Sequence, residues 1–566
     1  MFFLQTKEDQ MPQEFERLKV SMNQVKIFAV LLLLAVVFFT LRNMCVLEWS
    51  PQENSANNLK TDPSMPHDFC TFKPLPAAEA KEERLLLDSI AWPETPILPS
   101  PLSLEQTSDP AHSTFTILPG RGGGERHVGD QLEVLIKIYD FRGNAKKTGG
   151  DFLVSRLHSK TLTAGVAGRV VDHLNGSYSA VFPLLWEGSA QVEVTLVHPS
   201  EAVTVLRRLN KDLPDRIIFE GNFRSVLLSE RTTCNVCLHQ TSQPQCNYTD
   251  LRTGEPWFCY KPQKLSCDAR ISHLKTGYKK AIKTEEEKLF QRDVNMKVYI
   301  KASGPDSVTV LPQTEGQTRV SEDRGKSEHS GYYYQGVWRA LDGTRVQQFN
   351  SSSDISQCLN GKMVYMYGDS TMRQWFEYLD ASLPDAKEVN LNSPDQAGPF
   401  MIWDNVNKLL VTYRIHGLPL RIHIIPASKE SYIANELDGL VGGKNTVVVL
   451  GIWAHFSTFP IEFYIRRLQS IRRAVVRLLE RAPGTLVVIR TANLQYMTVY
   501  NVMGNGDWFS VQVDKVLRAM FKGLNVRMVD AWEMVLDHDL PHNLHPQPPI
   551  IKNMINVLLS YICPKK

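Results

Sequence analysis

Short apolar runs recur through the last part of the chain, and segments with helical spacing separate them. Six of these runs predict strands, at residues 363–367, 409–413, 420–425, 446–450, 486–489 and 526–529. They are rich in Val, Ile and Leu over most of their length, which is typical of parallel strands buried on both faces. We therefore predict that residues 350–566 form a three-layer α/β domain with a mainly parallel sheet.

One helix of this domain is predicted to be amphipathic. In residues 466–481, Leu, Ile and Val recur on one side and six arginines occupy other positions. These arginines could bind an anionic substrate, but a solvated helix face is the favoured interpretation.

An alternating pattern precedes this domain. Residues 131–139, 176–182 and 190–196 place apolar side chains at alternate positions, with turn signals between them. Such strands predict a β-sandwich, which we assign to residues 111–214. The Asn-Gly-Ser-Tyr turn at residues 175–178, before a strand that runs on to Trp186, resembles filamin or immunoglobulin-like repeats. Nothing in this domain indicates chemistry, so we interpret it as a spacer or binding module.

The N-terminal segment carries a hydrophobic run between basic residues. Residues 27–47 predict a signal anchor, and residues 1–26 a cytosolic tail, because the run follows several Lys and Arg residues. A cleaved signal peptide is the alternative. Either one places the remainder in the secretory lumen, as a type II Golgi membrane protein or a secreted protein. Residues 48–110, rich in Pro, Ser, Asn and Glu, predict a stem with a short helix at residues 80–92.

Cysteine usage favours an oxidising compartment. The chain has nine cysteines, and the eight beyond the apolar run are an even number. Five crowd into a cysteine-rich segment at residues 215–275, where disulfides are favoured over zinc or redox chemistry because no second cysteine pair stands at ligand spacing. Cys358 and Cys563 bracket the α/β domain and could staple its ends. The other predicted disulfide cysteines are Cys70, Cys234, Cys237, Cys246, Cys259 and Cys267.

Other features agree with this compartment. Asn175, Asn247 and Asn350 each begin a glycosylation acceptor motif. Residues 276–349 are polar, and we interpret them as a connecting segment that contains two short strands. The composition is ordinary, with 43% hydrophobic residues and a net charge of +3, so it gives no argument for a nucleic-acid partner.

The most informative stretch is residues 361–379. Its strand ends in Gly368-Asp369-Ser370, and the following residues, which include Arg373, continue at helical spacing. Open α/β sheets place reactive groups at the carboxyl ends of parallel strands, and a helix N-terminus favours a developing oxyanion. A Gly-Asp-Ser turn that only caps the helix is the alternative interpretation.

Nucleophilic catalysis by serine also needs a base and oxyanion donors, and later strand ends offer candidates. The N–H group of Gly451 is a candidate oxyanion donor, and Trp453 and His455 could line the cleft. A histidine among apolar neighbours is, however, more often structural. Arg490 and Asn493 suit recognition of hydroxyls or a carboxylate. An equal alternative is that they only cap the end of the strand at the surface.

A third candidate stretch, residues 537–545, precedes the closing helix and contains three histidines and two aspartates. Histidine is the natural general base near neutral pH, and a carboxylate can orient it. The same residue types bind metals, but no cysteines or carboxylates obviously converge from elsewhere. We therefore predict no metal site.

These motifs, in this order, resemble the PC-esterase branch of the SGNH (GDSL-type) hydrolases, which includes plant polysaccharide O-acetyltransferases and a sialic acid O-acetyltransferase. The resemblance rests on Gly-Asp-Ser370 with Arg373, the Gly-x-Trp-x-His motif that ends at His455, Arg490-Thr491, and a terminal His-Pro before a hydrophobic helix. A β-sandwich followed by a cysteine-rich segment resembles the neurexophilins. The chain after the apolar run therefore resembles the neurexophilin and PC-esterase domain (NXPE) family.

The resemblance implies roles for individual residues. Ser370 would carry the acyl group. The branch normally places its carboxylate and base as Asp-x-x-His, which Asp539 and His542 match in spacing. His545 better matches the position before the last helix, and Asp530 could then supply the carboxylate. The catalytic candidates are Ser370, His545, His542, Asp539 and Asp530, and the oxyanion or substrate-binding candidates are Gly368, Asp369, Arg373, Gly451, Trp453, His455, Arg490 and Asn493.

The resemblance implies a secretory-pathway O-acetyltransferase that acts on glycans or glycoproteins, sialic acids among them, through an acyl-Ser370 intermediate. An acetyl donor such as acetyl-CoA would be the co-substrate, and no cofactor would be bound. The first alternative is a glycan O-acetyl esterase. The second is a catalytically inactive, neurexophilin-like binding or adhesion protein with an extracellular protein partner.

Overall fold

The computed structural model describes residues 70, 72–120, 124–313, 329–393 and 396–565. The chain divides into two compact units, residues 1–66 and 67–566, and all described residues belong to the second unit. The predicted cytosolic tail and signal anchor lie outside the described residues. Among the helices of the described ranges, none combines the length and the apolar character needed to cross a membrane.

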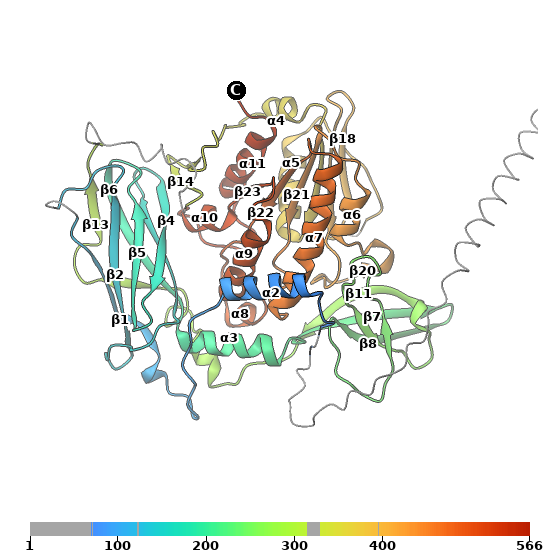
Figure 1. The fold of residues 1–566 in the computed structure, drawn as a ribbon, viewed down its shortest axis with the longest axis horizontal. Helices are drawn as coiled ribbons and strands as arrows, with labels where there is room; N and C mark the ends of the chain where they lie inside the picture. The colour runs from blue at the N-terminus through green and yellow to red at the C-terminus, as the bar shows by residue number, and fades with distance from the viewer. Residues whose placement is uncertain (1–69, 71, 121–123, 314–328, 394–395, 566) are drawn as a thin grey trace, which may run out of the picture. The chain divides into compact units, whose positions relative to one another are not determined.

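A seven-stranded sheet forms the centre of the C-terminal α/β region (Figure 1). Its strand order is β17-β18-β19-β16-β21-β22-β23. At one edge β18 is antiparallel to both of its neighbours, β17 and β19, and the other pairings are parallel. Every residue of β21 is buried, as expected of a strand covered on both faces. The strands are β17 (Lys387–Glu388), β18 (Phe400–Asp404), β19 (Leu409–Ile415), β16 (Met363–Gly368), β21 (Thr446–Gly451), β22 (Leu486–Arg490) and β23 (Arg527–Val529). The predicted parallel α/β arrangement is therefore confirmed.

Helices pack against this sheet and against one another. α5 contacts β16, β19 and β21, and α11 packs on α5, α4 and β23. A second group of helices, α6, α7 and α9, pack together. The bounds are α4 (Ser352–Leu359), α5 (Ser370–Ser382), α6 (Ile433–Gly439), α7 (Ile461–Arg481), α8 (Val499–Asn505), α9 (Asp507–Phe521), α10 (Ala531–Leu536) and α11 (Pro548–Ile562).

Arginines of α7 form ion pairs within the protein, whereas the sequence suggested either an anionic substrate or a solvated helix face. The helix α2 (Ala77–Ser89), within the predicted stem, packs on α7 and α9. Three carboxylates of α2 pair with α7 arginines at 2.8–2.9 Å, and the pairs are Glu79–Arg473, Glu82–Arg472 and Glu83–Arg466. The end of the predicted stem is therefore part of the compact unit.

The β-rich region before the α/β region is confirmed, and its strand pairings close into a circuit. The order β1-β2-β5-β4-β3-β6-β12 returns to β1, whereas a sandwich would have two separate sheets. Closure occurs at β4, whose first half pairs with β3 and second half with β5. The strands are β1 (Ser108–Ile117), β2 (Gln131–Asp140), β3 (Phe152–Ser159), β4 (Ala164–Asp172), β5 (Ser177–Pro183), β6 (Gly188–His198) and β12 (Val298–Ala302).

The segment predicted as a connection contributes to this region. β12 and β13 (Ser307–Val310) both pair with β6, and β14 (Gly331–Tyr334) pairs with β4 and β15 (Val337–Ala340). Residues from the connecting segment thus complete the β-rich region, in addition to the strands that the sequence pattern assigned to it.

The cysteine-rich segment forms a second sheet, in the order β20-β11-β7-β8-β10-β9, after the helix α3 (Ser200–Asp212). Its edge strand β20 (Ile425–Pro426) comes from the α/β region, so this sheet joins the two regions. The predicted strand at residues 420–425 is therefore wrong except at its last residue. The remaining strands are β7 (Ile217–Ser225), β8 (Leu228–Asn235), β9 (Gln245–Asn247), β10 (Phe258–Tyr260) and β11 (Arg270–Tyr278).

The predicted disulfide cysteines all pair. The bonds are Cys70–Cys237, Cys234–Cys259, Cys246–Cys267 and Cys358–Cys563. The last of them links the start of the α/β region to its end, as the sequence suggests. The side chains of the three predicted glycosylation sites, Asn175, Asn247 and Asn350, are exposed.

The disulfides should differ in their contribution to stability. Cys358–Cys563 spans 205 residues and Cys246–Cys267 spans 21. Because the entropy of closing a loop grows with the logarithm of its length, replacing both cysteines by serine should cost about 5 kcal/mol of unfolding free energy for the long loop and about 3 kcal/mol for the short one. Chemical denaturation of the two double variants measures both losses, and a larger loss for the short loop would contradict this expectation.

Candidate active site

The strand β16 and the helix α5 meet at a sharp turn. β16 ends at Gly368 and α5 begins at Ser370, so Asp369 is the N-cap residue. A Cβ atom on Gly368 would overlap the carbonyl oxygen of Gly451 in β21, so only glycine lets the two strands approach this closely. Ser370 lies at the carboxyl end of a central parallel strand and at a helix N-terminus.

The buried carboxylate of Asp369 joins this turn to the next strand. One oxygen accepts hydrogen bonds from the N–H of Thr371 (2.9 Å) and from its hydroxyl (2.6 Å). The other accepts from the N–H groups of Trp453 (3.2 Å) and Ala454 (2.9 Å), which follow β21. Asp369, a predicted site residue, thus fixes the start of α5 relative to the turn after β21.

Ser370 and His545 are in direct contact, with 2.8 Å between the serine Oγ and the histidine Nε2. Burial lowers the pKa of His545, and the nearby carboxylate of Asp369 partly opposes this shift. The imidazole is therefore neutral at pH 7 and can accept the serine proton. The Ser370 N–H is at the first position of α5 and has no acceptor within the described part of the chain, so it is available to bind an oxyanion.

The loop that carries His545 is held on both sides of the histidine. The Gln374 amide donates to the carbonyl oxygen of Pro546 at 2.8 Å. The Asn493 amide donates to the carbonyl oxygen of Asn543 at 3.0 Å. These two bonds fix the backbone next to His545 and so orient its ring toward Ser370.

Arg490 and Asn493, predicted to bind substrate, are fully buried. Arg490 donates to the Asn493 side-chain oxygen at 2.6 Å and to the carbonyl oxygen of Thr491 at 2.8 Å. Burial lowers the pKa of the Arg490 guanidinium to about 10. The Trp453 side chain is also fully buried. The structure therefore places these three residues behind the site, where they support it.

Ser370 opens into a cavity of about 400 Å³. Ala454 and His455 line it together with residues that the sequence did not indicate, and two of these, Tyr278 and Tyr496, are about half exposed, at 56% and 47%. Exposed aromatic rings suit contact with the apolar faces of sugar rings. The unforeseen lining residues are Tyr278, Arg421, Gln495, Tyr496, Asn501, Gly504, Asn505, Asn543 and Leu544. They come from separate segments, so no local motif could have found them.

His455 reaches this cavity with a fixed pattern of hydrogen bonding. His416 Nδ1 lies 2.6 Å from the carbonyl oxygen of Gly417 and donates to it, so His416 Nε2 accepts from His455 Nδ1 at 2.8 Å. Burial lowers the pKa of His416 to about 4 and that of His455 well below its ordinary value, so both rings are neutral. The backbone N–H of Arg421 lies 3.5 Å from His455 Nδ1, so this contact is weaker than the one with His416. His455 Nε2 is therefore left to accept a hydrogen bond in the cavity.

The structure does not bring the predicted carboxylates to His545. Asp530 binds both terminal nitrogens of Arg518, at 2.6 and 2.7 Å, and caps α10. Asp539 lies 3.5 Å from Arg156. Within the described residues no carboxylate forms an ion pair with His545, and no group of three or more His, Cys, Asp or Glu side chains could hold a metal ion. Among the described residues the site therefore pairs Ser370 with His545, and no carboxylate pairs with the histidine.

The segment that leads to His545 rests on the β-rich region. Arg156 in β3 donates to the carbonyl oxygen of His538 at 2.8 Å, and Glu193 holds the same guanidinium at 3.0 and 3.1 Å. Lys297 donates to His542 Nδ1 at 3.3 Å. The predicted catalytic candidates Asp539 and His542 are thus engaged with residues of the β-rich region, and this region does more than separate domains.

Replacing Asp369 by asparagine should disrupt the site. An amide keeps only one acceptor oxygen and directs N–H groups at two N–H donors, so we expect a loss of about 2 to 4 kcal/mol in unfolding free energy. Asp404→Asn is the matched control, because Asp404 caps only a local turn through Val406 and Asn407, where asparagine is tolerated. Thermal denaturation of both variants compares them, and equal losses would show that the junction at Asp369 is not special.

Two family models match this chain. The model described as neurexophilin matches residues 85–296, which contain most of the β-rich region and the cysteine-rich sheet. The model described as the C-terminal domain of NXPE family member 4-like proteins matches residues 338–563, which contain Ser370, His545 and the seven-stranded sheet. Together the two matches cover more than half of the chain, in the order that the sequence motifs indicate. The chain belongs to the NXPE family.

Proposed function

We propose that this protein transfers acyl groups, by way of an acyl-Ser370 intermediate, between an acyl donor and carbohydrate hydroxyls. The observation that carries this proposal is the 2.8 Å contact between Ser370 Oγ and Nε2 of a neutral His545. Ser370 lies at a helix N-terminus and lines a cavity. Family membership supports an esterase-like or acyltransferase-like role. On this proposal the α/β region is an SGNH-like domain, and the β-rich region is derived from an immunoglobulin-like or filamin-like fold.

The reaction uses groups already in place. Ser370 Oγ attacks the acyl carbonyl carbon while its proton passes to His545 Nε2, and the Ser370 N–H binds the carbonyl oxygen as it becomes negative. The leaving group departs with the proton from His545, which leaves acyl-Ser370. His545 then removes a proton from the incoming hydroxyl, whose oxygen attacks the acyl carbon. The bond from this carbon to Ser370 Oγ breaks, and His545 returns the proton to Oγ. A sugar hydroxyl gives transfer and water gives hydrolysis.

The cavity supports a sugar as the acceptor. Tyr278 and Tyr496 present half-exposed rings, and His455 offers a hydrogen-bond acceptor on a neutral ring. Arg421 lines the same cavity, and a cation there suits an acidic sugar such as a sialic acid. Disulfides and family membership indicate the secretory pathway, and we propose a Golgi location with an acetyl thioester such as acetyl-CoA as donor.

The serine hydroxyl should be essential. The purified chain is incubated with an activated acetyl ester and analysed by intact-mass spectrometry, where acyl-Ser370 adds the mass of one acetyl group. Ser370→Ala should abolish the adduct, whereas Ser382→Ala, at the other end of α5, should retain it. Discharge that is faster with a sugar than with water identifies a transferase, and the reverse identifies an esterase. Folded protein that forms no adduct with several donors would instead favour a neurexophilin-like binding protein.

The pH dependence of acylation should report His545 in its neutral form. Because burial lowers the pKa of His545, the rate should fall only as the pH drops below about 6.5, the ordinary histidine value. Arg373 lowers this pKa further and Glu377 raises it. Arg373→Gln should therefore move the acidic limb to higher pH, and Glu377→Gln should move it to lower pH. Rate profiles for the two variants test this, and shifts in the same direction would rule out His545 as the titrating base.

A further inference from the structure

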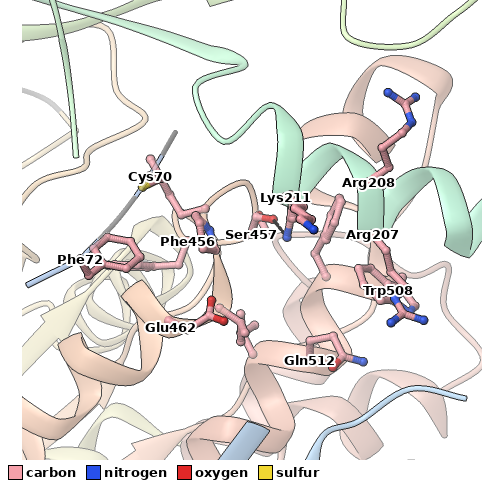
Figure 2. Close-up of a pocket in the computed structure, with 16 residues that line it drawn as sticks. Cys70, Phe72, Arg207, Arg208, Lys211, Phe456, Ser457, Glu462, Trp508 and Gln512 are labelled. Atoms are coloured by element: carbon pink, nitrogen blue, oxygen red, sulfur yellow. Dashed lines mark hydrogen bonds between the residues drawn. The ribbon is translucent and has the colours of Figure 1, made fainter. Parts of the chain in front are cut away.

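A second cavity, of about 730 Å³, shares a chain segment with the active site. Ala454 and His455 line the active-site cavity, while the residues that follow contribute Phe456, Ser457, Phe459 and Pro460 to the second. The other walls come from α3, the start of α7, α9, and the residues Cys70 and Phe72 (Figure 2). Its volume is within the range of small-molecule sites, about 300 to 1,000 Å³.

Much of the cavity wall is aromatic. Phe456 and Phe459 come from the shared segment, and Trp508 and Phe509 from the first turn of α9. Such a wall favours an apolar or aromatic body in the ligand, because burying apolar surface removes it from water.

The helix α3 adds positive charge with few partners. Figure 2 shows Arg207, Arg208 and Lys211 on this helix beside the cavity. Arg208 is occupied, since it binds both oxygens of Glu286 at 2.8 and 3.0 Å. Arg207 makes only a 3.4 Å hydrogen bond to a backbone carbonyl, and Lys211 forms no ion pair within the described ranges. One carboxylate, Glu462, lines the cavity.

Buried donors without acceptors lie in the same wall. Trp508 and Gln512, one turn apart on α9, are 7% and 8% exposed. The indole N–H and the amide nitrogen have no hydrogen-bond partner in the described part of the chain. A buried donor normally has an acceptor, and these two donors have none among the described residues. A ligand that brings acceptor oxygens would complement them.

We propose that this cavity binds a small amphiphilic anion, with a carboxylate or phosphate head and an apolar or aromatic body. The head pairs with Arg207 and Lys211, and the body packs against the aromatic wall at Trp508. The N-terminus of α7, at Ile461, faces the same cavity and adds to the attraction for an anion. The site is separate from Ser370, so its occupancy does not depend on the proposed acyl transfer.

The test uses 8-anilinonaphthalene-1-sulfonate, an aromatic anion whose fluorescence rises in apolar sites, titrated into the purified chain. We expect saturable binding, displaced either by decanoate or by adenosine 3′,5′-bisphosphate, which identifies the head as carboxylate or phosphate. Arg207→Gln with Lys211→Gln should weaken binding by about tenfold or more, because two charged contacts are lost.

Two controls make the outcome decisive. Arg224→Gln with Lys264→Gln removes the same charge from exposed positions of the cysteine-rich sheet and should leave binding unchanged. Ser370→Ala should also bind the probe normally, which separates this site from catalysis. Binding that Arg207→Gln with Lys211→Gln leaves intact in folded protein, or that neither anion displaces, would overturn the proposal.

Discussion

The candidate active site depends on one buried carboxylate. Asp369 accepts four hydrogen bonds, two from Thr371 at the start of α5 and two from the backbone after β21. Because these bonds join segments more than 80 residues apart in the sequence, they fix Ser370 relative to His455. The same carboxylate also opposes the fall in the pKa of His545. Asp369 therefore fixes the position of Ser370 and also contributes to the electrostatics of His545.

The two parts of the chain that the family models match are not independent in this structure. β11 of the cysteine-rich sheet pairs with β20 of the α/β region and ends at Tyr278, which lines the cavity at Ser370. Arg156 and Lys297 contact the segment before His545. The neurexophilin-like region therefore supplies part of the cavity wall and supports the loop that carries His545. The stability of this region and the alignment of Ser370 with His545 are linked.

Local sequence patterns predicted those features of the site that depend on interactions between residues close in the sequence. The strand, the Gly-Asp-Ser turn and the helix at Ser370 follow from apolar spacing and capping, whereas the preference for His545 over His542 came from the family resemblance. Residues 420–425 show where such patterns fail. Arg421 donates to the carbonyl oxygen of Gly504 and to the hydroxyls of two residues after β21. These long-range bonds hold the segment out of the predicted strand, and only the folded chain reveals them.

His542 stands three residues before His545, where an Asp-x-x-His pattern ending at His545 would have its aspartate. His542 accepts a hydrogen bond from Lys297, which also pairs with Asp507 at 2.6 Å, so an aspartate at 542 would be drawn to this lysine rather than to His545. Orientation of His545 instead comes from the amides of Gln374 and Asn493, which bind the backbone on either side of it. Without a carboxylate partner the imidazolium is less stabilised. On the proposed function, proton transfer from Ser370 would therefore rely on preorganisation of the Ser370–His545 pair, which the β-rich region helps to maintain.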